Sequence, residues 1–207
     1  MYSQQAFLET DLPSLHELMQ SARLANIITM TAMGLMATPL PLLLAPEEGP
    51  FGTLYGHLAR ANSQWSTAPI TDALALFMGP DAYISPSWYA SKQEHHQVVP
   101  TWNYITVHAY GPIEFFEDKE RLRGLVSKLT DHHEQARPAP WAVTDAPKKF
   151  IDSMLKAIIG IRLPIIRLEG KRKMSQNRPE KDRQDVAANL AQSPHATDRD
   201  VAKLIPL

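Results

Sequence analysis

One short stretch of the chain, residues 79–104, gathers aromatic rings, hydroxyl groups, a lysine and an amide. The side chains of interest in this stretch are Ser85, Ser87, Trp88, Tyr89, Lys92, Thr101, Trp102 and Asn103. Aromatic and apolar surfaces hold the faces of a planar ligand, while a few polar groups fix its edge. The same rings can also be ordinary core or subunit-interface aromatics. Composition leaves both interpretations open.

A basic cluster follows at residues 171–179, with the sequence KRKMSQNRP. It leaves an expected strand and enters a turn that ends in a proline. Such a cluster can hold a phosphate, because fixed cationic donors suit a dianion. It can also be a nucleic-acid patch or a solvated run of charge, since short basic clusters are common on protein surfaces.

Several classes of site lose their usual sequence support. The chain contains no G-x-x-x-x-G-K-[ST], G-x-G-x-x-G or G-x-S-x-G motif. His16 and His133 each begin like a zinc-protease helix but lack the second histidine one turn later. The neighbouring pairs 95–96 and 132–133 point away from each other on a strand or a helix. We therefore expect no metal site, and no residue is an evident catalytic base.

Composition indicates an ordinary globular protein. The chain has 207 residues, of which 44% are hydrophobic and 21% charged, with a net charge of -1 and no cysteine. Disulfides, thiolate nucleophiles and cysteine-type zinc sites are thereby excluded. The first residues lack the pattern of a secretory signal, so we expect a cytoplasmic protein. The uncharged run at 24–46 is rich in threonine and proline, which favours strands over a membrane helix.

The first 117 residues read as mostly β structure. After a helix that Thr10 or Asp11 can cap, a hairpin is expected at 24–44 and a strand at 52–58. Further strands are expected at 74–78, closed by Gly79-Pro80, and at 82–85, 98–99, 104–110 and 113–116. Because these strands do not alternate strictly with helices, an antiparallel barrel is favoured over a doubly wound sheet.

Helices are expected in the second half of the chain. A stripe at Leu122, Leu125 and Leu129 predicts one helix, and a second is expected from Asp145 to Gly160. Residues 161–168 return to a strand in which Pro164 implies an edge or a bulge. From residue 179 on, the chain is polar and reads as a loose helix or disorder.

Four blocks in chain order carry a family resemblance. They are GHLARANSQW at 56–65, GPDAYISPSWY at 79–89, VPTWNY at 99–104 and KMSQNRP at 173–179. With RPAPW at 137–141, they resemble the blocks of PaiB-type FMN-binding negative transcriptional regulators. The resemblance extends from near the N-terminus to about residue 183.

The resemblance implies an α+β, mainly β fold: an antiparallel split β-barrel of the pyridoxamine-phosphate-oxidase type with peripheral helices. Residues 1–178 would form this FMN-binding domain, and residues 179–207 a helical or partly disordered tail. The family also implies a homodimer with FMN sites at the interface, and DNA or a regulatory protein as a further partner.

Site roles follow from the matched blocks and are expectations of this resemblance. Arg60, Lys92, Lys173 and Arg178 are candidates for phosphate charge, with Ser85, Ser87 and Thr101 adding hydroxyl donors. Trp88, Tyr89 and Trp102 are candidates for the ring wall, while Asn62, Asn103, Gln176 and Asn177 would meet the polar edge of the flavin or support the side chains that do.

Three functions fit these expectations. The first is an FMN-binding regulator, and the second is an FMN-dependent reductase or oxidase acting on a small molecule, because the flavin carries hydride chemistry in any protein. The third is a dimer without cofactor. Direct DNA binding lacks an identifiable helix-turn-helix, and the near-neutral charge does not favour it.

Overall fold

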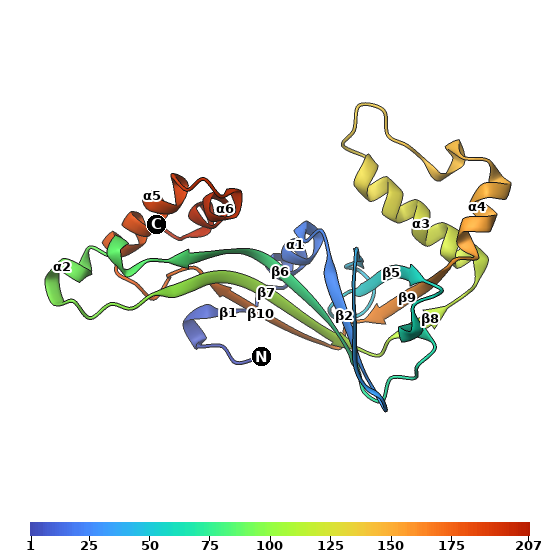
Figure 1. Cartoon of the computed structure of the whole chain (residues 1–207), viewed down its shortest axis with the longest axis horizontal. Helices are drawn as coiled ribbons and strands as arrows, with labels where there is room; N and C mark the ends of the chain where they lie inside the picture. The colour runs from blue at the N-terminus through green and yellow to red at the C-terminus, as the bar shows by residue number, and fades with distance from the viewer. The chain divides into compact units, whose positions relative to one another are not determined.

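Figure 1 traces the computed structural model, which describes the backbone of residues 1–207 and the side chains of residues 1–94 and 96–207. The chain forms two compact units. Unit 1 comprises Met1–Ala22, Phe77–His108 and Glu169–Leu207, and unit 2 comprises Arg23–Leu76 and Ala109–Leu168. Two long strands, β6 (Ala73–Ile84) and β7 (Thr101–Gly111), contribute residues to both units.

Unit 1 is built on strands in the order β1-β10-β7-β6. The short β1 (Leu8–Glu9), which follows a 3-10 turn at Gln5–Phe7, pairs antiparallel with β10 (Arg167–Lys173). In this register Leu8 lies opposite Lys171. The pairing therefore brings the N-terminal residues beside the basic cluster, which begins in the last residues of β10.

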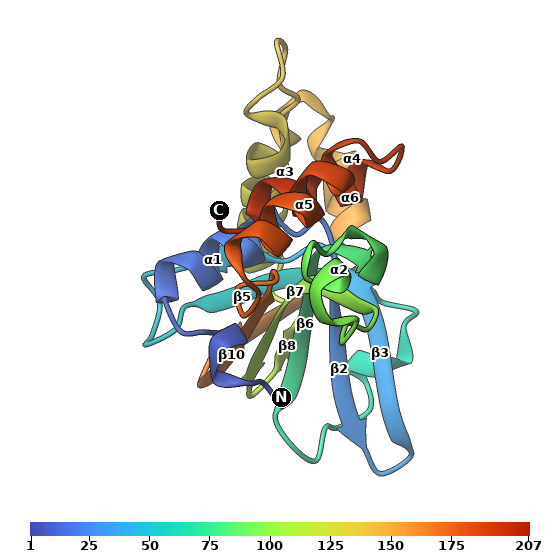
Figure 2. The same cartoon turned by 90° about the vertical axis from the view of Figure 1, so that its left-hand side faces the viewer.

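Helices complete the core of unit 1. α1 (Leu12–Ser21) is capped by the Asp11 carboxylate, which accepts from the backbone N–H of Ser14 at 3.0 Å, and α2 (Ser91–His95) follows a 3-10 turn at Pro86–Trp88. α5 (Glu180–Ala191) and α6 (Ala196–Leu204) lie together at the C-terminus (Figure 2). The region from residue 179 on, which was expected to be a loose helix or disordered, thus forms two helices. Their buried faces share one core with residues of the strands and of the turns beside them: Ala82, Ile84, Tyr89, Ile105, Met174, Val186, Ala187, Leu190, Val201 and Ile205.

Unit 2 contains a four-stranded antiparallel sheet in the order β4-β5-β9-β8. Its strands are β4 (Leu43–Ala45), β5 (Thr53–Ala59), β9 (Ile158–Pro164) and β8 (Glu114–Phe116). A hairpin of β2 (Ala25–Thr31) and β3 (Gly34–Leu40) precedes them.

Two helices and two 3-10 turns pack in unit 2. α3 (Lys119–Glu134) contacts β5 and β9, and α4 (Lys148–Leu155) contacts α3. The 3-10 turns span Ser63–Trp65 and Val143–Asp145. The helices share one buried cluster with the sheet: Phe116, Leu122, Leu125, Leu129, Ile151 and Leu155. Leu122, Leu125 and Leu129, the stripe expected from the sequence, lie on the buried face of α3.

The sequence-based expectation of a mainly antiparallel β fold with added helices is confirmed, but several element boundaries were wrong. β6 continues through Gly79 and Pro80, where a break was expected. Residues 98–99 are outside any strand. α4 ends at Leu155, and Gly160 lies inside β9, with the Phe116 ring directly over its Cα. At this position a side chain would clash with the ring, so the glycine serves strand packing rather than helix termination.

The uncharged run at 24–46 forms β2, β3 and β4. Within the part of the chain that the structure describes, no helix has the length and apolarity needed to span a bilayer.

Candidate functional site

A pocket of about 220 Å³ in unit 1 collects much of the predicted site. We call it the basic pocket. It forms where the 3-10 turn before β1, the start of β7, and the end of β10 with the turn after it meet. Its lining residues are Gln4, Phe7, Tyr89, Val99, Pro100, Thr101, Asn103, Lys173, Ser175, Asn177 and Arg178. Six of these were expected from the sequence: Tyr89, Thr101, Asn103, Lys173, Asn177 and Arg178.

Lys173, the last residue of β10, is one of two cations in this pocket. Its Nζ donates to the Trp102 carbonyl at 2.7 Å and to the Thr101 hydroxyl. Burial lowers the pKa of Lys173, and the nearby charges of Lys171 and Arg178 lower it further. Neutral oxygens and neighbouring cations therefore surround an ammonium group that an anion would stabilise.

Arg178 is the second cation, and its guanidinium carbon lies 4.8 Å from the centre of the Tyr89 ring. Tyr89 is 2% exposed, and its buried hydroxyl has no hydrogen-bond partner in the described part of the chain. Burial raises the pKa of Tyr89, an effect that Arg178 opposes. Neither Lys173 nor Arg178 forms an ion pair with any described residue. The basic pocket thus combines uncompensated positive charge with an unpaired phenol.

The turn after β10 is held by two amide side chains. Gln176 accepts from the backbone N–H of Met174 at 2.6 Å and donates to the Arg172 carbonyl, so its amide closes the turn. Asn103, which is fully buried, donates to the Ser175 hydroxyl at 3.0 Å. Ser175 has a φ of 60°, a left-handed conformation that is uncommon for a non-glycine residue. Backbone strain of this kind is often found at functional sites.

Other predicted residues of unit 1 do not line the basic pocket. The Ser85 hydroxyl accepts from the Ser87 backbone N–H at 3.2 Å, and Lys92 Nζ donates to Ser87 Oγ at 3.4 Å. Trp88 packs partly buried against the core. Trp102 is 52% exposed, and its ring stands edge-on to that of Tyr83, with the ring centres 5.9 Å apart.

Arg60 and Asn62 belong to unit 2, where they have partners of their own. Arg60 forms an ion pair with Glu117, and its Nε donates to the Lys156 carbonyl at 2.7 Å. Asn62 Nδ2 donates to the Thr38 hydroxyl at 2.8 Å, and its Oδ1 caps the turn at Ser63–Trp65. Their predicted contact with a cofactor stays a prediction.

Sequence reasoning missed several residues of the basic pocket. Ser175 stands inside the KMSQNRP block, and Val99 and Pro100 inside VPTWNY, so the matched blocks contained a signal for them. Gln4 and Phe7 carry no such signal, because they reach the pocket through the pairing of β1 with β10.

Among the described residues, no group of three or more histidine, aspartate or glutamate side chains lies close enough together to hold a metal ion. The His95 side chain, half of one pair considered above, lies outside the described residues.

Comparisons with known proteins give a family match. Residues 1–167 match the family described as "Putative FMN-binding domain". The "Protease synthase and sporulation protein PAI 2" of Bacillus subtilis (strain 168) is 31% identical over 99% of this chain and 96% of its own length.

Solved structures add a likeness of fold. A conserved hypothetical protein, Rv2991 from Mycobacterium tuberculosis, has a TM-score of 0.58 at 13% identity, covering 87% of this chain and 95% of that one. An FAD and heme binding protein from Mycobacterium smegmatis has a TM-score of 0.57 at 16% identity, covering 80% and 73%. Together with the two sheets, these likenesses confirm the predicted split-barrel fold class.

Proposed function

This chain belongs to the FMN-binding domain family that its residues 1–167 match, and from that premise we propose that the basic pocket holds the phosphate end of FMN. The observation that carries the proposal is the pair of cations, Lys173 and Arg178, which line one pocket without a carboxylate partner among the described residues. A phosphate dianion would supply the missing charge.

The other donors of the basic pocket fit the same group. Thr101, Ser175 and Asn177 offer hydroxyl and amide hydrogens, and the unpaired hydroxyl of Tyr89 gains a partner when a phosphate oxygen is near. Asn103 and Gln176 support this arrangement indirectly, because they fix Ser175 and the turn after β10.

The size of the pocket fits part of the cofactor. Pockets for whole ligands usually measure about 300–1,000 Å³, whereas the basic pocket measures about 220 Å³. It therefore suits the phosphate and the adjoining ribityl chain. We assign the isoalloxazine ring to other aromatic and polar side chains of the predicted set in unit 1, namely Trp88, Trp102, Ser85, Ser87 and Lys92. A second protomer would complete the site, with Arg60 and Asn62 as its contributions to be tested.

We further propose that the homodimer is a PaiB-type negative transcriptional regulator. The similarity to the Bacillus subtilis protein over nearly the full length of both chains supports this role. Bound FMN would supply redox chemistry, while the residues of this chain anchor it. A DNA or protein partner would then respond to the state of the flavin site.

FMN affinity tests the site. Lys173→Ala and Arg178→Ala should each weaken FMN binding by about 10- to 150-fold, corresponding to the loss of roughly 1.5–3 kcal/mol from one hydrogen bond to a charged group. Lys203→Ala is the control, because Lys203 lies on α6 and pairs with Asp200. Titration of flavin absorbance gives the dissociation constants, and Arg60→Ala tests the residue of unit 2. Unchanged affinity in both pocket variants would remove the basic pocket from the flavin site.

The regulatory role needs a cellular experiment. In a strain that lacks this protein, transcripts under its control should rise, and wild-type protein should repress them again while the Lys173→Ala/Arg178→Ala double variant should not. Light scattering gives the protomer number of both proteins. Turnover of a reduced nicotinamide by the FMN-loaded protein, without any change in transcripts, would favour the oxidoreductase alternative instead.

A further inference from the structure

A second group of charged and aromatic side chains lies in unit 2, on the face of the four-stranded sheet that α3 covers. Four residues in register form a row across this sheet: Leu43 on β4 is opposite Tyr55 on β5, Tyr55 is opposite Arg162 on β9, and Arg162 is opposite Glu114 on β8. Directly opposed side chains of antiparallel strands share a face. The row thus places apolar, phenolic, cationic and anionic groups next to one another.

α3 forms the opposite wall. Its Arg121 donates from Nη1 to Glu114 Oε1 at 2.8 Å, and the guanidinium carbon lies 3.9 Å from the centre of the Phe116 ring. Gly124, Leu125 and Lys128 continue the wall along the helix. Helix and sheet enclose a pocket of about 340 Å³, which we call the α3 pocket. This volume is at the small end of the roughly 300–1,000 Å³ found for ligand sites.

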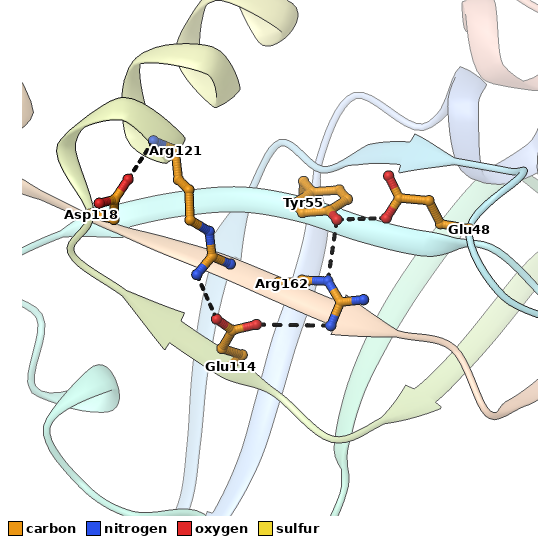
Figure 3. Close-up of polar contacts among 6 residues, drawn as sticks. All are labelled: Glu48, Tyr55, Glu114, Asp118, Arg121 and Arg162. Atoms are coloured by element: carbon orange, nitrogen blue, oxygen red, sulfur yellow. Dashed lines mark hydrogen bonds and ion pairs between the residues drawn. The ribbon is translucent and has the colours of Figure 1, made fainter.

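Part of the polar surface of the α3 pocket is internally paired. Figure 3 shows Arg162 between Tyr55 and Glu114: its Nε donates to the Tyr55 hydroxyl at 3.2 Å, and its Nη1 lies 3.8 Å from Glu114 Oε2. The Tyr55 hydroxyl donates to Glu48 at 2.6 Å. Glu114 thereby shares one negative charge between two guanidinium groups.

Other donors of the α3 pocket have no hydrogen-bond partner. Within the described residues, the Nη groups of Arg162 make no hydrogen bond, and Lys128 makes neither a hydrogen bond nor an ion pair. Glu114 and Asp118 act on Arg121, and Glu48 accepts from Tyr55, so these carboxylates are already engaged. Lys128 is the cation of the α3 pocket that no described carboxylate pairs. An anionic group in the pocket would give Lys128 and the Nη groups of Arg162 a partner.

Gly124 keeps the mouth of the α3 pocket open. It lies exposed in the interior of α3, its φ is not positive, and a Cβ added there would meet no atom within 4 Å. Glycine in a helix interior is less stable than alanine. Neither backbone conformation nor packing therefore favours glycine at this position. The missing side chain leaves room for a molecule to enter the pocket beside the helix backbone.

We propose that the α3 pocket binds a small organic monoanion, a carboxylate carried on an aromatic or aliphatic body. The carboxylate would meet the two-pronged donor face of Arg162, with Lys128 adding charge, while the apolar body packs on Leu43 and Leu125. The α3 pocket shares no residue with the basic pocket. The proposal is independent of FMN binding and goes beyond it.

Phenylacetate is a suitable probe, with phenylacetamide as its uncharged control. Titration is followed by NMR of ¹³C-labelled leucine methyl groups, so that the shifts of Leu43 and Leu125 report the place of binding. We expect saturable shifts at these two residues and an affinity for the acid about tenfold or more above that for the amide, because the guanidinium interaction requires the charge. Equal affinities, or shifts elsewhere with none at Leu43 and Leu125, would overturn the proposal.

Two variants at Gly124 and one at Arg162 test the geometry. Gly124→Leu should fill the mouth of the pocket and abolish phenylacetate binding. Gly124→Ala should leave the dissociation constant within about threefold of wild type, since leucine and alanine are both good helix formers and only leucine reaches into the pocket. Arg162→Gln should weaken phenylacetate binding about tenfold without affecting phenylacetamide. Circular dichroism confirms folding of each variant. Wild-type affinity in either Gly124→Leu or Arg162→Gln would contradict the assignment.

Discussion

Asp182 of α5 accepts two hydrogen bonds from Ser91, the first residue of α2: the backbone N–H donates to Oδ1 at 3.0 Å and the hydroxyl donates to Oδ2 at 2.7 Å. Both residues are buried. The residue before α2, Ala90, has no side chain that can cap the helix. A carboxylate from a helix about ninety residues later therefore satisfies the free N–H at the start of α2.

Ser91→Ala should lower the free energy of unfolding by about 1.5–3 kcal/mol, because it removes a hydrogen bond to a buried carboxylate. Urea unfolding measures the change. Ser87→Ala is the matched control, since this exposed hydroxyl has only a 3.4 Å contact with Lys92, and it should change stability by less than about 0.5 kcal/mol. Equal effects of the two substitutions would mean that the pair with Asp182 contributes little.

The left-handed backbone at Ser175 gives a second prediction. Ser175→Ala and Ser175→Gly both remove the hydroxyl that Asn103 contacts, but only glycine adopts a φ of 60° without steric cost. The glycine variant should therefore be more stable than the alanine variant by about 1 kcal/mol, although both should be less stable than wild type. Chemical denaturation compares them, and an alanine variant at least as stable as the glycine variant would show that this backbone carries no strain.

The surroundings of Gly111 and Gly124 predict that substitution by alanine changes the free energy of unfolding in opposite directions. Gly111→Ala should destabilise the protein by roughly 1–3 kcal/mol, because its Cβ would overlap the carbonyl oxygen of Pro164, the last residue of β9. Gly124→Ala should stabilise it by about 0.5–1 kcal/mol, because the added methyl group meets open space in a helix. Thermal unfolding of both variants, compared at one temperature, checks the two signs.

Local sequence signals predicted α1 and α3 well. The Asp11 cap and the stripe at Leu122, Leu125 and Leu129 act over one or two turns, and the structure has both. Long-range pairing overrides such signals elsewhere: β6 continues through Gly79-Pro80, although the dipeptide favours a turn. α2 was missed, because its cap comes from Asp182 rather than from a neighbour in sequence.

The same distinction applies to the candidate site. Lys173, Asn177 and Arg178 fall in one sequence block and share one pocket, so the block predicted them together. Phe7 and Gln4 join them only through the register of β1 with β10, which no local pattern reveals. The α3 pocket was not predicted at all, because Tyr55, Arg162 and Glu114 stand far apart in sequence and meet only as a row across three strands.

The burial of His57 in β5 predicts that the free energy of unfolding depends on pH. Burial lowers its pKa below the usual value near 6.5, and its buried Nδ1 has no hydrogen-bond partner among the described residues. Its surroundings include the apolar side chains of Val126, Met154 and Leu155. The unfolded chain therefore binds a proton at His57 more readily than the folded protein does. The contribution of neutral His57 to the free energy of unfolding should be complete above about pH 6.5 and should decrease as the pH falls towards the pKa of His57 in the folded protein.

His57→Leu should remove this contribution, since leucine suits the apolar surroundings and does not titrate. The free energy of unfolding is measured at intervals from pH 5 to 8 for both proteins, and the other histidines contribute equally to each curve. The wild-type curve should be steeper below about pH 6.5, by at most about 1.4 kcal/mol per pH unit for a single proton. Parallel curves across this range would show that His57 protonates as readily in the folded protein as in the unfolded chain.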